Sequence, residues 1–136
     1  MGELVRSRLR QEVDVGLQVE IRKSGDVSIL DVQGKAIIGR NTDVLNENLR
    51  KAFDNGARKV LVNFTGVTQI DSSGISTIVR TFVTLHNAGG DLKLYGLNNR
   101  VKMVFDLMGL LRAIPSFEKE SEAVASFANR GYTAQS

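Results

Sequence analysis

Hydrophobic and polar residues alternate with a period of two in two segments near the start of the chain, 17–23 and 27–34. This period is typical of half-buried β-strands. Residues 24–26 (SGD) lie between the two segments and form a characteristic turn sequence. The two segments are therefore expected to pair as a hairpin.

Three later segments also indicate strands. Residues 59–64, KVLVNF, form a short apolar run, which is typical of a strand covered on both faces. Residues 91–97, DLKLYGL, indicate another strand. A short last strand is expected around Ala113 and Ile114, where the only proline, Pro115, interrupts it.

Apolar residues recur with the period of an amphipathic α-helix in four further segments: 42–53, 75–85, 98–109 and 120–131. The residues expected to face the core are Val101, Val104, Phe105 and Met108 in the third segment and Val124 and Phe127 in the last. Polar residues and glycines mark the ends of these helices.

Helix caps follow from residue type. Asn41 or Thr42 is expected to cap the first helix, and Asn98 the third, because their side-chain oxygens accept from unpaired backbone N–H groups. Gly56 and Gly109 follow the same two helices and are expected to end them in the left-handed conformation.

Strands that alternate with helices predict an α/β fold with a mostly parallel sheet. The 136 residues fit one domain. We expect a flexible N-terminal arm over residues 1–14, the domain over 15–130 and a C-terminal tail over 131–136.

Composition excludes several classes of protein. The net charge of +3 and the shortage of aromatic residues argue against a nucleic-acid partner. No apolar run reaches the roughly 18–20 residues that a membrane span needs, and no secretory signal is evident. The chain contains no cysteine, which excludes disulfides and fits a reducing compartment, so a cytoplasmic location is expected.

The sequence QIDSSGIS, residues 69–76, has the composition of a site. A serine between a strand and a helix suggests a helix cap, a catalytic nucleophile or a target of modification. A nucleophile elbow would need glycines two residues before and after Ser73, where Asp71 and Ile75 stand. The only histidine, His86, is thirteen residues further along the same helix, roughly 20 Å away. No catalytic residue is therefore expected.

Cofactors and metals are not expected either, because no phosphate-binding loop or metal-ligand spacing is present. The start of a helix nevertheless offers unpaired N–H groups and partial positive charge. From the residues alone, capping by Asp71, Ser72 or Ser73 is favoured. Asp71 is the best cap of the three, which leaves two hydroxyls without a structural role.

The segment VTQIDSSGISTIV, together with the sequence from VLVNF to LLRAI, resembles the STAS domains of bacterial anti-sigma factor antagonists. The resemblance covers about residues 17–128. It implies a single-domain STAS fold, with a four- to five-stranded, mostly parallel mixed sheet and about four helices mainly on one face. It also implies a partner-switching regulator rather than an enzyme.

The resemblance further implies that Ser73 is phosphorylated, with Ser72 as the second choice. An anti-sigma factor that is also a serine kinase would bind the unphosphorylated form and release its sigma factor, and a Ser/Thr phosphatase would restore that form. The expected partner-binding residues are Asp71, Ser72, Ser73, Gly74, Ile75, Ser76, Thr77, Lys35 and Arg40. The last two make the loop after the second strand basic, where many members of the family are acidic, and this charge is expected to neutralise a phosphate or select a partner.

Two other functions remain open from the sequence. The domain is alternatively a STAS scaffold of a signalling or transport assembly that does not switch. A third hypothesis is a small-ligand-binding or nucleotide-binding α/β domain.

Overall fold

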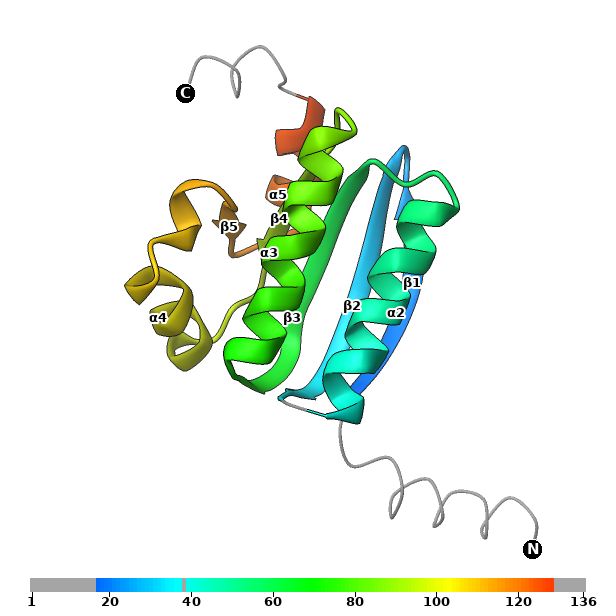
Figure 1. Cartoon of the computed structure of the whole chain (residues 1–136). Helices are drawn as coiled ribbons and strands as arrows, with labels where there is room; N and C mark the ends of the chain where they lie inside the picture. The colour runs from blue at the N-terminus through cyan, green and yellow to red at the C-terminus, as the bar shows by residue number, and fades with distance from the viewer. Residues whose placement is uncertain (1–16, 38, 129–136) are drawn as a thin grey trace, which may run out of the picture.

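The computed structural model describes residues 17–37 and 39–128 of the chain. Within this part, ten elements follow in the order β1 Leu17–Ser24, β2 Val27–Ala36, α2 Arg40–Asp54, β3 Lys59–Ile70, α3 Ser72–Asn87, β4 Asp91–Tyr95, α4 Asn99–Leu107, the 3-10 helix η1 Leu110–Arg112, β5 Ser116–Phe117 and α5 Glu120–Ala128 (Figure 1). The predicted α/β fold is confirmed. The predicted arm at 1–14 and tail at 131–136 lie outside the described residues.

The five strands form one mixed sheet in the order β1-β2-β3-β4-β5. β1 and β2 pair antiparallel around a turn in which Gly25 has a φ of 62°, and this is the predicted hairpin. The three remaining pairs are parallel. Parallel strands place their carboxyl ends at one edge of the sheet, where the following helices begin.

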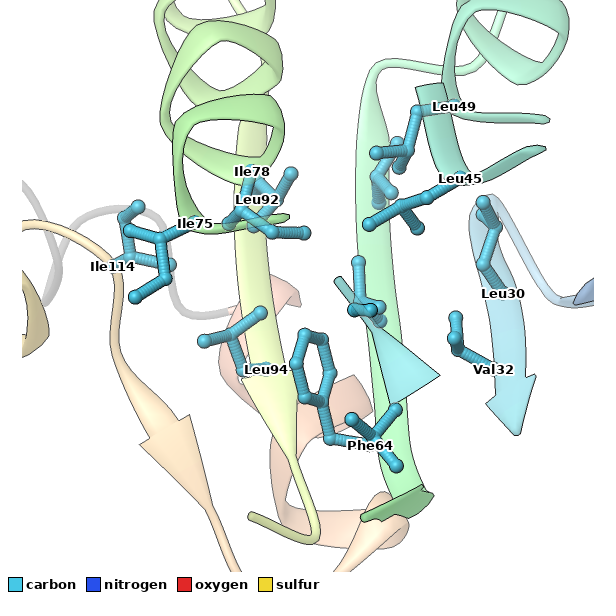
Figure 2. Close-up of a cluster of buried hydrophobic side chains, with 14 of the residues drawn as sticks. Leu30, Val32, Leu45, Leu49, Phe64, Ile75, Ile78, Leu92, Leu94 and Ile114 are labelled. Carbon is cyan, nitrogen blue, oxygen red and sulfur yellow. The ribbon is translucent and has the colours of Figure 1, made fainter. Parts of the chain in front are cut away.

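Three helices cover one face of the sheet and α5 covers the other (Figure 1). The main core lies under α2, α3 and α4, where Leu45 and Ile78 (Figure 2), together with Phe105, are fully buried in one hydrophobic cluster. Leu61 of β3 points to the opposite face of the sheet, where it packs with Phe127 of α5. The expected burial of the third strand on both faces is thus confirmed.

Charged residues hold α5 to the sheet. Arg22 of β1 forms ion pairs with Asp31 of β2 (2.6 Å) and with Glu120 of α5. The Tyr95 hydroxyl of β4 donates to the same Glu120 carboxylate (2.7 Å). The hydrogen bonds from Arg22 lower the pKa of Asp31 and of Glu120, whereas burial and the Glu120 carboxylate raise the pKa of Tyr95 to about 12.

Two strands are longer than predicted and one is displaced. β2 continues to Ala36 and β3 to Ile70, because their last residues pair through two register shifts that the alternation pattern does not reveal. The last strand is Ser116–Phe117, and the expected strand around Ala113–Ile114 is wrong. Pro115, which has no N–H, takes part only as an acceptor from Leu94 N–H (2.9 Å).

Helix capping was predicted correctly for α4 but not for α2. Asn98 accepts from the N–H of Val101 (2.8 Å), as expected. The N-cap of α2 is Gly39, with a φ of 100° and no side-chain cap hydrogen bond, so the predicted caps Asn41 and Thr42 are wrong. Asn41 instead donates to the carbonyl of Lys35 at the end of β2 (3.0 Å), and Thr42 donates to that of Ile37 just after it (2.8 Å).

The inward-facing residues were also predicted in part. Val101 and Phe105 are buried, and Val104 packs against the same core. Met108 is 55% exposed, which contradicts its predicted inward position, because α4 ends at Leu107 and Met108 is the C-cap.

Candidate functional site

Asp71 caps the helix that carries the serines, as predicted. It lies between β3 and α3, and its Oδ1 accepts the N–H groups of Ser73 (3.0 Å) and Gly74 (3.2 Å). The same oxygen accepts the hydroxyl of Ser73 (2.6 Å). One carboxylate oxygen therefore fixes both the start of the helix and the orientation of Ser73.

The Ser73 hydroxyl has a second neighbour, on another helix. The Thr42 Oγ1 atom of α2 lies 2.8 Å from Ser73 Oγ and 2.8 Å from the carbonyl oxygen of Ile37. The two hydroxyls supply two protons for three contacts, with Asp71, with Ile37 and with each other. One of the three contacts therefore lacks a proton at any moment, and the Thr42 proton can be directed either to Ile37 or to Ser73.

Gly74 is required because the backbone of α3 approaches β2 closely here. A Cβ atom at this position would lie 2.4 Å from the carbonyl oxygen of Ala36 and 2.9 Å from Cγ1 of Ile70. The N–H of Asp71 donates to the same Ala36 oxygen (3.2 Å). The serine turn is therefore fixed directly on the end of β2.

The predicted partner-binding residues of α3 divide into two groups by exposure. Ser72 and Ser76 are exposed and Ser73 is partly exposed, so these three hydroxyls lie at or near the surface. Ile75 and Thr77 are buried, at 2% and 0% exposure. Their side chains support the surface from beneath, and Thr77 does so by donating to the Ser73 carbonyl (3.1 Å).

Lys35 and Arg40 flank the segment between β2 and α2, and both side chains are exposed. No hydrogen bond or ion pair joins either cation to Ser73 within the part of the chain that the structure describes. The segment is nevertheless attached to the serine turn, because Thr42 follows Arg40 by two residues and contacts Ser73. A group added to Ser73 would thus project beside a basic segment.

A cleft of about 310 Å³ lies beside the serine turn and was not predicted. Ile37, Ile70 and Asp71 line one side of it, and Arg100 and Val104 of α4 line the other. In Figure 1, α4 lies beside the end of α3 at which the serines stand.

The outer side of α4 carries apolar residues. Leu107 is 81% exposed, and Met103 and Met108 are also exposed. Leu107 stands three residues after Val104 and seven after Arg100, so it shares their side of the helix. We call the exposed first turn of α3 (Ser72 to Ser76), the start of α2 and this side of α4 the serine surface.

Nothing at the serine turn resembles a hydrolytic site. His86 lies in the last turn of the same helix as Ser73 and stacks on Phe82 with ring centroids 5.8 Å apart. Within residues 17–37 and 39–128 no cluster of His, Cys, Asp or Glu has the composition of a metal site. None of the helices described in this range is long and apolar enough to cross a membrane.

A mixed five-stranded sheet with a capped serine turn at the start of α3 defines a STAS-type domain. The STAS domain family model matches residues 18–123, and the chain belongs to this family. The predicted family is thereby confirmed.

Its relatives carry consistent names. The anti-sigma-B factor antagonist of Bacillus subtilis is 27% identical over 96 residues, which are 71% of this chain and 86% of that protein. The anti-sigma F factor antagonist of Paenibacillus polymyxa is 21% identical over 111 residues, which are 81% of this chain and 94% of that protein.

Solved structures share the fold. An anti-sigma factor antagonist from Mycobacterium paratuberculosis superposes with a TM-score of 0.75 at 15% identity, over 84% of this chain and 96% of that one. The Bacillus cell fate determinant SpoIIAA in its phosphorylated form superposes with a TM-score of 0.63 at 20% identity, over 82% of this chain and 98% of that one.

Proposed function

We propose that this protein is an anti-sigma factor antagonist whose binding is switched by phosphorylation of Ser73. The observation that carries the proposal is the Ser73 hydroxyl itself, held at the partly exposed start of α3 by Asp71 (2.6 Å) and Thr42 (2.8 Å). Neither neighbour makes it a nucleophile of a known hydrolytic kind. A fixed hydroxyl at a helix N-terminus is well placed to be a substrate of another protein.

In the unphosphorylated state, the serine surface binds an anti-sigma factor that is also a serine kinase, and the sigma factor is released. The exposed apolar residues of α4 support this proposal, since large apolar side chains beside polar groups mark protein interaction surfaces. Lys35 and Arg40 contribute positive charge to the same surface and favour an acidic partner.

Phosphorylation of Ser73 adds a charge of about −1.5 to −2. The Ser73 O–H donor to Asp71 is lost, and the phosphate stands beside the Asp71 carboxylate, so a partner that fitted the hydroxyl meets added bulk and charge. The fold survives, because the helix N-terminus favours an anion. Thr42 then turns its single hydroxyl proton from the Ile37 carbonyl to the phosphate.

The partners of this cycle are the anti-sigma factor kinase, which adds the phosphate, and a Ser/Thr phosphatase, which removes it. The cycle takes place in the cytoplasm, where sigma factors act. In this proposal the protein itself performs no catalysis and needs no cofactor.

The test is to incubate the protein with ATP and serine kinases of the anti-sigma factor type from the same organism, and to locate the phosphate by mass spectrometry. We expect modification at Ser73 that is lost in Ser73→Ala and kept in the matched variant Ser72→Ala. Calorimetry with the same kinase should show at least tenfold weaker binding for the phosphorylated protein. Modification of Ser72 alone, or equal affinity of both forms, would refute the switch and favour a scaffold.

A further inference from the structure

A larger pocket lies at the end of α3 that is distant from Ser73. Its volume is about 570 Å³, within the range of small-molecule sites. Its walls include Phe82 and His86 of α3, Lys93 of β4, Ala113, and Ser126 and Phe127 of α5. Figure 1 shows the last turn of α3 at the end of the helix opposite the serine surface, and residues of α5 complete the pocket there.

Lys93 is the unusual residue of this pocket. It is 2% exposed, although lysine is almost never fully buried without a paired charge. Its Nζ donates to Ser126 Oγ (2.9 Å) and lies 4.6 Å from the centroid of the Phe127 ring. Within the described residues it forms no ion pair, so an ammonium group with three donors has one neutral acceptor.

The remaining cations of the pocket already have partners. The Arg58 guanidinium donates to the carbonyls of Phe53 and Ala57 and lies over the Phe53 ring at 4.0 Å. Lys59 pairs with Asp26 at 2.6 Å. Lys93 is therefore the buried cation of this pocket that lacks a carboxylate in contact within the described residues, whereas Arg58 is exposed.

Burial has the expected effect on this ammonium group. Desolvation lowers the pKa of Lys93, and the carboxylate of Asp91, which also lines the pocket without forming an ion pair with Lys93, opposes that shift. A buried charge without a close counter-ion destabilises a fold. A group that destabilises the fold while lining a pocket is a candidate for ligand binding.

We propose that this pocket binds a small monocarboxylate with a flat apolar body. The carboxylate pairs with Lys93, and the body packs against Phe82 and Phe127, whose rings supply the apolar part of the wall. A single negative charge matches the single ammonium group that is not paired. The site is separate from Ser73, so the proposal does not depend on the partner switch.

The test uses two probes of nearly the same shape, 2-naphthoate and the neutral 2-naphthamide, titrated into the full chain. We expect 2-naphthoate to bind at least tenfold more tightly by calorimetry. It should shift the amide signals of Gly89, Gly90 and Lys93 and leave that of Ser73 in place. Equal affinity of the two probes, or no binding of 2-naphthoate, would overturn the proposal.

Variants locate the site. Lys93→Met removes the charge while nearly keeping the side-chain volume and should weaken 2-naphthoate at least tenfold, whereas the control Lys51→Met, at an exposed position of α2, should not. Ala113→Trp narrows the pocket while Lys93 itself is not replaced, and it should weaken both probes. Unchanged affinity in Lys93→Met would overturn the assignment, and so would 2-naphthyl phosphate binding more than tenfold tighter than 2-naphthoate, because the site would then be a phosphate site.

Discussion

Thr42 and Ser73 are 31 residues apart in the chain, yet their hydroxyl oxygens lie 2.8 Å apart. This contact joins the starts of α2 and α3, and it connects the proposed phosphorylation site to the basic segment that carries Arg40. It also gives Thr42 a role that depends on the state of Ser73. A hydroxyl that shares its proton between two acceptors can turn toward a phosphate when one is added.

Thr42→Val should therefore destabilise the phosphorylated protein more than the unphosphorylated one. Valine keeps the shape of threonine but cannot donate to the phosphate. The difference should be roughly 1–2 kcal/mol, because a hydrogen bond to a charged group contributes about 1.5–3 kcal/mol and the bond to the Ile37 carbonyl, which the variant loses in the unphosphorylated form, about 0.5–1.5 kcal/mol. The measurement is urea unfolding of both forms, with phosphoserine incorporated at position 73 during synthesis. An equal loss in the two forms would show that Thr42 does not contact the phosphate.

Gly74→Ala should be strongly destabilising although alanine is the better helix former. The added Cβ would lie 2.4 Å from the Ala36 carbonyl oxygen, and neither backbone can move without disturbing the Asp71 cap. We expect a loss of roughly 1–3 kcal/mol. Ser72→Ala is the matched control on the same turn and should change the free energy of unfolding by less than about 0.5 kcal/mol. A near-neutral Gly74→Ala would mean that the close approach to β2 is not maintained in solution.

Leu107→Ser tests whether α4 belongs to the partner-binding surface. Leu107 is 81% exposed, so its replacement should leave the free energy of unfolding nearly unchanged. If the anti-sigma factor covers this side of α4, its affinity should fall about tenfold or more, as for a central apolar contact. Calorimetry with the kinase identified by the phosphorylation experiment measures this. The control Val83→Ser removes another exposed apolar residue, on α3 away from its first turn, and should not affect binding.

The sequence pattern predicted correctly those features that depend on interactions between residues close together in the chain. The hairpin, the apolar strand 59–64 and the caps Asp71 and Asn98 each follow from residues a few positions apart, and the structure confirms them. The motif around Ser73 also predicted the family correctly.

The errors arose where distant segments decide the outcome. Thr42 has the residue type and position of a helix cap, but in the structure its hydroxyl contacts the Ile37 carbonyl after β2 and the Ser73 hydroxyl instead. Met108 fits the helical period of α4, but the helix ends before it. The pocket around Lys93 was not predicted. The pattern of a strand indicates on which face of the sheet a lysine lies, but it does not indicate that α5 covers that face.

Lys93→Met should stabilise the protein at neutral pH. Burial lowers the pKa of Lys93 in the folded state below the ordinary value of 10.5, so the folded protein binds this proton more weakly than the unfolded chain does. The charge therefore destabilises the fold fully below the folded pKa, and the penalty disappears as pH rises from the folded pKa to about 10.5. Methionine has a similar volume and carries no charge.

The protein should gain stability at pH 7, and the charge-dependent part of this gain should disappear as the pH rises toward about 11. Urea unfolding of both proteins across this range measures it, and Lys51→Met, which replaces an exposed lysine, should show no such trend. A loss of stability at pH 7 would instead mean that the hydrogen bond to Ser126 and the Phe127 ring together outweigh the cost of burial. In that case Lys93 would be a structural residue of the α5 interface, and the main physical reason for placing a ligand beside it would be removed.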